Sequence, residues 1–431
     1  MNMKAPRGTK DLLPGETEKW QYAEKILKEI CDTYHYSEIR TPLFEHTEVF
    51  KRGVGDSTDI VQKEMYTFTD QGGRSITLRP EGTATVARAF VENKLYGNPV
   101  QPVKLYYFMQ MFRYERPQHG RMRQLNQFGV EVLGSANPQV DAEVIDLAML
   151  CYKKLGISSL KLVINSLGDK ESRDNHRQAL VEYFTPVKDE LCSDCQRRLT
   201  DNPLRILDCK KDRDHPSMST APSILDYLNE FSRSYFEDVK QYLEMMDIPY
   251  TVDKNLVRGL DYYNHTAFEI MSEADGFGAI TTLLGGGRYN HLTQELGGPD
   301  VPGIGFGMGM ERLMLAMEAE GVDIPVDREL DTFIITMGND AENAAVAMMH
   351  KLRKNGIQVD KDYQGRKMKA QFKAADRLQA KYAIIIGEDE LDKQVVHIRE
   401  MATGEQFEAA INDVLSILTE RLSGGKKHGR T

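Results

Sequence analysis

The chain has 431 residues, and its 65 acidic and 55 basic side chains give a formal net charge of −10. This acidic total argues against a protein that packages nucleic acid through overall positive charge, although it does not exclude a local basic surface. Hydrophobic residues make up 41% and charged residues 28% of the chain, which excludes a mostly disordered protein and fits two or three folded domains.

Membrane and secretion signals are missing from the sequence. No apolar run approaches the ~18 residues that a bilayer span needs, and the charged N-terminal residues lack the apolar stretch of a secretory signal. Five cysteines, a sparse and odd number, argue against a disulfide framework and suit a reducing compartment. We therefore expect a cytoplasmic protein with no membrane partner.

The first half of the chain begins with a helix, expected over residues 17–34 because apolar side chains there fall on one stripe at helical spacing. An extended stretch around Pro42 follows, since a proline fits a strand end or an edge strand. Residues 103–115 are rich in aromatics and predict a buried strand, and residues 126–133 predict a strand that returns beside it. We expect two antiparallel strands joined by a long, arginine-rich loop over 115–124.

The second half has a different organisation. Residues 170–250 are charged, mostly helical and free of glycine-rich motifs, so we interpret them as a helical insertion. A helix breaks near residues 319–328, and the alternation of strands and helices beyond it predicts a small α/β domain with a mostly parallel sheet. We therefore expect a discontinuous domain over 1–325 that the insertion interrupts, a second domain over 328–425 and a flexible tail over 426–431.

A cluster of four arginines lies within the twelve residues from Phe112 to Arg123. The guanidinium group offers a rigid fork of donors that matches phosphate oxygens. Arg113 ends a predicted strand that could aim it, and Glu115 and another arginine follow at once. A solvated surface loop is the alternative, but this arrangement favours a polyphosphate site.

Glycines occupy every second position of residues 303–309. In a strand, this spacing strips one face of side chains, and interior glycines ask for a reason such as close approach of a ligand. A flat heterocycle could lie against the bare backbone while Ile304, Phe306 and Met308 pack on the other face. Arg312 follows where a helix begins. Tight strand packing would explain two such glycines but not four, and the pattern is neither the dinucleotide fingerprint nor a Walker motif.

Three shorter motifs are weak on their own, because each could be a plain surface loop. They are residues 256–264 with Arg258, Tyr262 and Tyr263, residues 284–290 with Arg288 and Tyr289, and residues 78–83 with Glu81 and Thr83.

Three of the five cysteines lie in the expected insertion, at Cys192, Cys195 and Cys209, with His215 nearby. The C-x2-C spacing is common in four-ligand zinc sites. The second half is not a tidy pair, however, because five residues separate Cys209 from His215. Ordinary reduced cysteines are the favoured interpretation, no metal site is assigned, and zinc binding stays open.

Residues 351–381 carry ten basic and three acidic side chains, a local charge of +7 within an acidic chain. Such a segment is a candidate contact for a nucleic-acid backbone. A solvated helix face explains the same charges equally well.

Taken together, these segments resemble histidyl-tRNA synthetases, a family of class II aminoacyl-tRNA synthetases, over nearly the whole chain. Pro42 is similar to the proline of class II motif 1, residues 112–121 to motif 2 and residues 305–312 to motif 3. Residues 256–263 and 286–289 resemble the two signatures peculiar to the histidine enzymes. The resemblance implies an α+β fold, an antiparallel sheet flanked by helices, with a helical insertion and a C-terminal α/β anticodon-binding domain.

The resemblance also implies the reaction of a histidine--tRNA ligase. Histidine and ATP give histidyl-adenylate and pyrophosphate, and the histidyl group then moves to the 3′ end of its tRNA. Expected partners are therefore histidine, ATP, the histidine tRNA and a second copy of the chain in a homodimer. We expect Mg²⁺ to accompany the nucleotide, because the β- and γ-phosphate charges exceed what the arginines cover.

Site residues follow from the resemblance position by position. In the ATP site, Arg113 should hold the α-phosphate and Arg312 the γ-phosphate. Glu115 and Arg121 should contact the adenine end. Arg258 should lie beside the reacting α-phosphate and carboxylate, which makes Arg258 and Arg113 the catalytic pair. The histidine site should contain Glu81, Thr83, Gln127, Glu131, Arg258, Tyr262, Tyr263 and Tyr289.

Within the histidine site, Glu81 and Thr83 should bind the α-ammonium group, and Glu131 is the expected acceptor for the imidazole ring. Hydrogen bonds to both ring nitrogens would reject wrong side chains by a factor of ~10⁴ or more, so no editing is expected.

Three other functions are alternatives to the histidine--tRNA ligase reaction. A non-catalytic relative, the regulatory subunit of ATP phosphoribosyltransferase, lacks the anticodon-binding domain and has degraded arginine motifs, whereas Arg113, Arg258 and Arg312 are all present here. A sister class II synthetase for proline, glycine or threonine is disfavoured by the signature at 256–263. An RNA-binding protein without catalysis is the third alternative.

Overall fold

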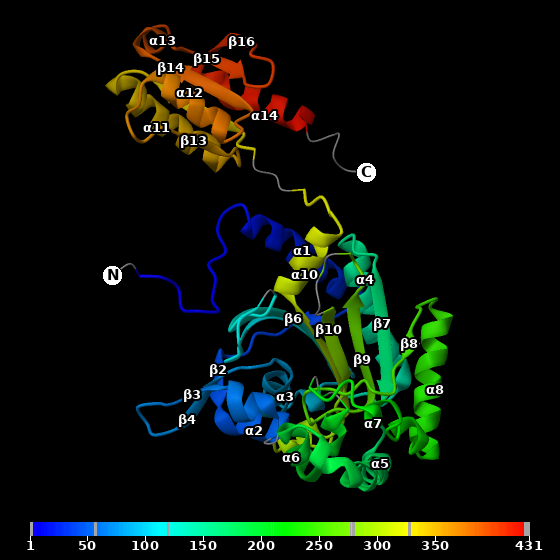
Figure 1. Ribbon diagram of the computed structural model, residues 1–431. Coiled ribbons are helices and arrows are strands. Elements are labelled where there is room, and N and C mark those ends of the chain that lie inside the picture. Colours follow the sequence, from blue (N-terminus) through cyan, green and yellow to red (C-terminus); the bar gives the residue numbers. More distant parts are fainter. Residues whose placement is uncertain are drawn as a thin grey trace. The chain divides into compact units, whose positions relative to one another are not determined.

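The computed structural model describes residues 3–55, 58–118, 120–207, 209, 211–275, 277, 281–325 and 329–425. The chain divides into two units, Met1–Ile324 and Pro325–Thr431, and each is considered by itself (Figure 1). None of the described helices has the length and apolarity that a bilayer crossing requires. The tail expected over 426–431 lies outside the described residues.

A large mixed sheet forms the centre of the first unit. Its strands are β1 (Ser37–Glu38), β5 (Val103–Phe112), β6 (Gln124–Leu133), β7 (Leu160–Ser166), β8 (Thr251–Val252), β9 (Asn264–Ser272), β10 (Thr282–Arg288) and β11 (Gly303–Gly309). They lie in the order β1-β5-β6-β11-β10-β9-β7-β8. Neighbouring strands are antiparallel except at the two edges, where β1 pairs with β5 and β7 with β8 in parallel. The expected antiparallel sheet is confirmed.

β5 and β6 form the long hairpin that the sequence predicts. Their pairing runs from Val103 opposite Leu133 to Phe112 opposite Gln124, and the many aromatic residues of β5 favour its extended backbone. The hairpin carries the arginine-rich loop, residues 113–123, at one end of the sheet. The loop therefore starts and finishes on rigid strands.

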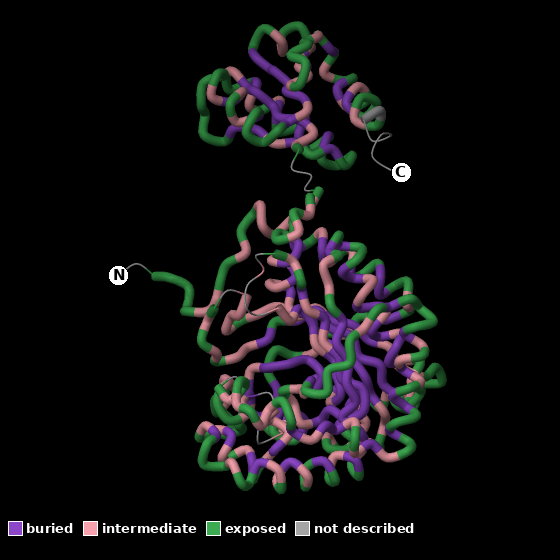
Figure 2. Tube along the Cα trace, turned by 45° about the vertical axis from the view of Figure 1, so that its right-hand side comes forward, coloured by how far each residue is buried: buried purple, intermediate pink, exposed green. Residues whose placement is uncertain are grey.

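The two faces of the large sheet differ. On one face, Phe128, Val130, Phe306 and Met308 are at most 2% exposed and belong to a core shared with helices. These helices are α1 (Thr17–Thr33), α4 (Pro138–Lys154), α8 (Glu230–Met245) and α10 (Met310–Ala319). Figure 2 shows buried segments gathered along the strands of the sheet. The expectation that alternate residues of β11 pack opposite its glycines is confirmed.

The opposite face of the sheet carries the glycines. Beside them, α3 (Thr83–Glu92) packs Val86 and Phe90 against Tyr107 and Met109 of β5. A smaller antiparallel sheet and two helices complete this side of the unit: β2 (Phe44–His46), β3 (Tyr66–Thr69), β4 (Ser75–Leu78), α2 (Thr47–Val54) and α9 (Leu292–Glu295). The smaller sheet has the order β2-β4-β3.

Between β7 and β8 the chain forms a run of helices. They are α5 (Lys170–Phe184), α6 (Ser193–Asp201), α7 (Pro216–Ser219) and α8. The segment around α5 and α6 has its own small core, which includes Phe184 and Cys195. By contrast, α8 places Tyr235 and Val239 in the core of the large sheet. The part with its own core is therefore shorter than the insertion of residues 170–250 expected from the sequence.

The second unit alternates strands and helices. Its elements are β12 (Thr332–Thr336), α11 (Asn339–Lys354), β13 (Val359–Lys361), α12 (Met368–Arg377), β14 (Tyr382–Ile386), α13 (Glu388–Asp392), β15 (Val395–Glu400), β16 (Gln406–Ala410) and α14 (Val414–Gly425). The strand order is β13-β12-β14-β15-β16, and the first three strands are parallel as predicted. The antiparallel strands β15 and β16 were not predicted, because their apolar residues are few and interrupted by charged or polar ones.

Candidate active site

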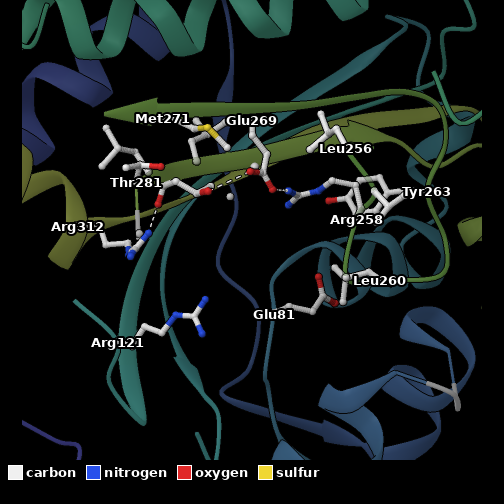
Figure 3. A pocket seen from close by; sticks show the side chains of 18 of the residues that line it. Glu81, Arg121, Leu256, Arg258, Leu260, Tyr263, Glu269, Met271, Thr281 and Arg312 are labelled. Carbon is white, nitrogen blue, oxygen red and sulfur yellow. Dashed lines mark hydrogen bonds and ion pairs between the residues drawn. The ribbon is translucent and has the colours of Figure 1, made fainter. Parts of the chain in front are cut away.

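A cavity of about 870 Å³ opens on the glycine-bearing face of the large sheet (Figure 3). Of the twelve site residues expected from the sequence, ten line it: Glu81, Thr83, Arg113, Glu115, Arg121, Gln127, Arg258, Tyr262, Tyr263 and Arg312. The other two, Glu131 and Tyr289, are 0% and 2% exposed and contact residues of the lining. Side chains from distant parts of the sequence therefore meet in one place.

Gly285, Gly307 and Gly309 line the cavity on its sheet side, and polar side chains lie close to several glycines of β10 and β11. An added Cβ would lie 2.1 Å from Arg258 Nη2 at Gly285, 2.0 Å from Glu131 Oε2 at Gly305 and 2.2 Å from Gln127 Nε2 at Gly307. The expected bare backbone is wrong for Gly305, which lies under Glu131 outside the cavity lining, whereas Gly307 lines the cavity beside Gln127. The reason is that β6 runs beside β11 and contributes polar side chains that cover these glycines.

Three arginines line one cavity from the loop after β5 and from the start of α10. Arg113 is held in place because its Nε donates to the Pro80 carbonyl oxygen at 2.7 Å. Glu115 lies 3.9 Å from Arg113 Nη1 and 3.4 Å from Arg121 Nη1. Burial and then the charge of Arg121 lower the pKa of Arg312, so these two guanidinium groups are close enough to repel. Figure 3 shows both on one side of the cavity, where a bound polyanion would relieve the repulsion.

Arg258 is anchored by a carboxylate that the sequence analysis missed. Arg258 forms an ion pair with Glu269 (Figure 3). Glu269 also accepts a 3.0 Å hydrogen bond from Thr282 Oγ1. Arg312 Nη1 in turn donates to the Thr282 carbonyl oxygen, so one chain of contacts joins two arginines of the cavity. Burial alone would lower the pKa of Arg258, but the Glu269 carboxylate raises it. A charged residue in the apolar middle of β9 is the signal that could have identified Glu269.

Glu81 caps the first turn of α3. Its carboxylate accepts hydrogen bonds from the backbone N–H groups of Thr83 and Ala84, both at 2.8 Å. The Tyr262 hydroxyl donates to it at 3.4 Å. Burial raises the pKa of Glu81, and the backbone donors oppose this shift. The charge of Arg113 also lowers the pKa of Glu81, so an acidic and a basic group of the cavity lie within range of each other.

Glu131 receives hydrogen bonds from three hydroxyl groups. Thr83 and Tyr107 donate to one of its oxygens at 2.7 Å and 3.3 Å, and Tyr289 donates to the other. Burial raises the pKa of Glu131 to about 8, although the hydroxyl donors lower it in part. Because Thr83 lines the cavity, it links Glu131 to the space open to a ligand. Tyr107 was missed, since its place in an aromatic strand predicts only a core residue.

Aromatic rings form one wall of the site. The Tyr262 and Tyr263 ring centroids are 4.5 Å apart, and the Tyr262 and Tyr289 centroids are 5.7 Å apart. The Arg258 guanidinium carbon lies 5.6 Å from the Tyr263 centroid. The wall combines apolar surface with hydroxyl groups, as a pocket for a polar heteroaromatic side chain requires.

The cysteine cluster lies near the cavity but has a different composition from the one considered in the sequence. Ligand atoms of Cys192, Cys195, Cys209 and Asp212 all lie within 4.8 Å of one another. His215 is occupied elsewhere: its Nε2 lies 3.4 Å from Glu190, and its Nδ1 accepts from the Ser217 backbone N–H. His215 is therefore not part of the cluster, because it caps α7 instead.

Comparisons with known proteins cover both units. A sequence model of the family described as histidyl-tRNA synthetase matches residues 8–168 and 209–313, and one described as an anticodon binding domain matches residues 331–421. The chain is 66% identical over 426 residues to a protein of Oceanobacillus iheyensis named histidine--tRNA ligase, with 99% of each covered. It is 64% identical over 425 residues to histidine--tRNA ligase 1 of Shouchella clausii, with 99% of this chain and 100% of that protein covered.

A solved structure shows the same fold. The apo histidyl-tRNA synthetase of S. aureus is 50% identical and matches with a TM-score of 0.83, covering 97% of this chain and 100% of that one. The α+β architecture is therefore shared with that enzyme.

Proposed function

The chain belongs to the histidyl-tRNA synthetase family, and we propose that the cavity of its first unit is where histidine is activated. As a histidine--tRNA ligase, the enzyme joins histidine and ATP to form histidyl-adenylate and pyrophosphate. It then transfers the histidyl group to the 3′-terminal adenosine of its tRNA and releases AMP. The observation that carries the proposal is that Arg113, Arg258 and Arg312 line one cavity together with Glu81.

In the activation step, a carboxylate oxygen of histidine attacks the α-phosphorus of ATP. The new P–O bond forms as the P–O bond to pyrophosphate breaks, and negative charge builds on the equatorial oxygens. Arg113 and Arg258 would stabilise this charge, because guanidinium groups stay protonated and are held here by fixed partners. The attacking carboxylate is already ionised, so the step needs positioning rather than a general base.

The surroundings of Arg258 support its place beside the reacting atoms. Glu269 holds one end of the guanidinium group, and its buried Nε has no hydrogen-bond partner among the described residues. A buried donor without a partner costs free energy until a ligand satisfies it. An oxygen of the substrate carboxylate or of the α-phosphate would supply that partner.

The rest of the ATP molecule would extend toward the other arginines. Arg312 is proposed to bind the γ-phosphate, and Glu115 and Arg121 the adenine end. Mg²⁺ would add positive charge at the β- and γ-phosphates, and the Glu115 and Glu269 carboxylates that face the cavity are oxygen ligands of the kind it prefers.

Histidine would occupy the end of the cavity between α3 and the aromatic wall. Glu81 and Thr83 are proposed to bind the α-ammonium group, with Gln127 beside them and Tyr262, Tyr263 and Tyr289 around the ring. Glu131, joined to the cavity through Thr83, is proposed to recognise the imidazole. A wrong side chain would leave these buried polar groups without partners, which is a physical basis for rejecting it.

Assembly and tRNA contacts are further parts of the proposal. Leu43, Phe44 and Phe68 are about half exposed, at 47%, 53% and 47%, and exposed apolar side chains next to Pro42 support a homodimer through this region. The domain over 328–425 is proposed to bind the anticodon region of the histidine tRNA, and residues 1–325, interrupted by 170–250, to form the catalytic domain. We place the enzyme in the cytoplasm.

Amino-acid-dependent exchange of pyrophosphate into ATP tests the function directly. Each of the standard amino acids is offered to the full-length enzyme, and we expect exchange with histidine alone. Exchange with proline, glycine or threonine would instead indicate a sister synthetase. Absence of exchange with every amino acid would contradict catalysis and favour a regulatory or RNA-binding protein.

A further inference from the structure

Three cysteines and an aspartate meet where the start of α6 lies against the connection from α6 to α7. Cys192 immediately precedes α6, and Cys195 lies in its first turn. Cys209 and Asp212 follow on the connection to α7. All four ligand atoms lie within 4.8 Å of one another. Cys209 and Asp212 repeat the two-residue spacing of Cys192 and Cys195, and the structure brings the two pairs together.

The spacing of the sulfur atoms fits a tetrahedral ion. Cys192 Sγ lies 3.7 Å from Cys209 Sγ. Ligands at the usual Zn–S distance of ~2.3 Å stand ~3.8 Å apart in a tetrahedron, whereas bonded disulfide sulfurs are ~2.05 Å apart. Cys192, Cys195 and Cys209 are all free thiols. The arrangement therefore matches a metal site and not a disulfide.

The surroundings also suit thiolate ligands. The Cys192 backbone N–H donates to both oxygens of Asp212 at 3.1 Å, which orients the carboxylate. Cys192 and Cys195 lie at the N-terminus of α6. The partial positive charge of the helix dipole at that end favours thiolates. Lys211 lines a small cavity together with Cys209 and forms a 3.0 Å ion pair with Asp194. The charges of Asp194, Cys192 and Cys209 raise the pKa of Lys211, so this ammonium group is close enough to offset part of the negative charge of thiolates around a divalent ion.

The cluster is buried, unlike the groups of exposed acidic side chains that are common on protein surfaces. Cys195 is 0% exposed and Cys209 7% exposed, and both belong to the small core of α5 and α6. Packing explains the apolar contacts of these thiols, and the Cys192 N–H holds the Asp212 carboxylate beside them, where both kinds of ligand face one point. Soft thiolates with one oxygen ligand in tetrahedral spacing select Zn²⁺ over hard cations such as Mg²⁺ or Ca²⁺.

We propose that Cys192, Cys195, Cys209 and Asp212 bind one structural Zn²⁺ ion. All four positions are filled by protein ligands, so the ion has no open position for substrate. It fixes the start of α6 to the connection before α7. That connection supplies Leu207, Cys209 and Arg213 to the lining of the active-site cavity, so the ion holds one wall of the cavity in place.

Metal analysis of the full-length enzyme tests the site. The protein is produced without a metal-binding tag, purified with a phosphine reductant and no chelator, and its zinc content is measured by mass spectrometry. We expect about one zinc ion per chain. Reconstitution of the chelated protein with Co²⁺ should give thiolate-to-cobalt charge-transfer bands and the visible bands of tetrahedral coordination, a readout that needs no variant to fold.

Matched variants identify the ligands. Cys192→Ser and Cys209→Ser should lose the bound zinc, and Asp212→Asn should weaken zinc affinity at least ~10-fold. Two controls should keep it: Cys151→Ala, a buried thiol of the main core, and His215→Asn, which preserves a capping acceptor for α7.

Three results would overturn the proposal. The first is that the wild-type protein binds neither Zn²⁺ nor Co²⁺ under reducing conditions. Cys192→Ser could retain full zinc content. His215→Asn could lose zinc while Asp212→Asn keeps it, which would restore the ligand set considered from the sequence.

Discussion

Glu131 differs from the other carboxylates of the site in being sealed from solvent. It is 0% exposed and accepts hydrogen bonds from three hydroxyl groups. Burial raises its pKa from 4.5 to about 8, so the folded state holds the proton more tightly than the unfolded state. Stability contributed at this residue therefore falls as pH rises from about 4.5 to about 8 and is constant above that range.

Replacing Glu131 with glutamine should remove this pH dependence while keeping a carbonyl oxygen for the hydroxyl donors. We expect the melting temperature of Glu131→Gln, relative to the wild type, to be higher near pH 8 than near pH 5. Thermal unfolding of the full-length protein without ligands, at both pH values, measures this. If the difference in melting temperature between the variant and the wild type were the same at pH 5 and at pH 8, the raised pKa of Glu131 would be contradicted. The variant should also raise KM for histidine, because it changes the buried group proposed to recognise the imidazole ring.

Single residues also show where sequence reasoning reached its limit. The arginines were found because they stand in motifs, whereas Glu269, Tyr107 and Asp212 look like ordinary strand or loop residues. Glu269 holds Arg258, and Tyr107 donates to Glu131, which lies on another strand. Asp212 reaches the cysteines through a turn whose geometry the sequence does not reveal. The pairing of elements decides such contacts, and no local pattern reports it.

At the scale of the element, β11 combines a packed face with an open one. The alternation of glycines with large apolar residues predicts both the strand and its two faces. The packing of Phe306 and Met308 in the core shared with the helices confirms the apolar face. What fills the open face depends on the register of β6, which places Glu131 opposite Gly305. Register follows from strand pairing across the sheet, so the sequence of β11 alone could not predict it.

Adding one methyl group to this strand should disturb the histidine site. In Gly305→Ala the new Cβ would lie 2.0 Å from Glu131 Oε2 and 2.2 Å from the Val130 carbonyl oxygen. We expect a loss of ~1–3 kcal/mol in the free energy of unfolding and a higher KM for histidine. Denaturant unfolding and steady-state exchange kinetics measure the two effects.

The matched control is Gly97→Ala, where an added Cβ meets no atom within 4 Å. This variant should unfold and exchange pyrophosphate like the wild type. If Gly305→Ala behaved in the same way as Gly97→Ala, the close packing of Glu131 over β11 would be wrong.

At the scale of the molecule, the proposal assigns activation to the cavity of the first unit. The basic segment 351–381 lies in the second unit. In this segment Lys369, Lys373 and Arg377 recur along α12 and are all exposed, so they present one positive stripe. Charge alone left tRNA binding and simple solvation equally open, and membership of the family favours tRNA binding.

Reversing the charge of this stripe should separate the two half-reactions. We expect Lys369→Glu, Lys373→Glu and Arg377→Glu combined to raise KM for tRNA and to weaken its salt dependence, because phosphate contacts release counterions. Histidine-dependent pyrophosphate exchange, which requires no tRNA, should stay unchanged. Lys393→Glu, at another exposed position of the same unit, is the control. Equal aminoacylation kinetics in the triple variant and the wild type would place the tRNA contact elsewhere.

The most direct test of the active-site assignment is histidine-dependent pyrophosphate exchange by Arg258→Ala, measured together with ATP binding by equilibrium dialysis. Arg258 is predicted to stabilise the reacting α-phosphate and carboxylate, so exchange should be abolished while ATP still binds through Arg113 and Arg312. Near-normal exchange in Arg258→Ala would contradict the central claim that converging guanidinium groups activate histidine in this cavity.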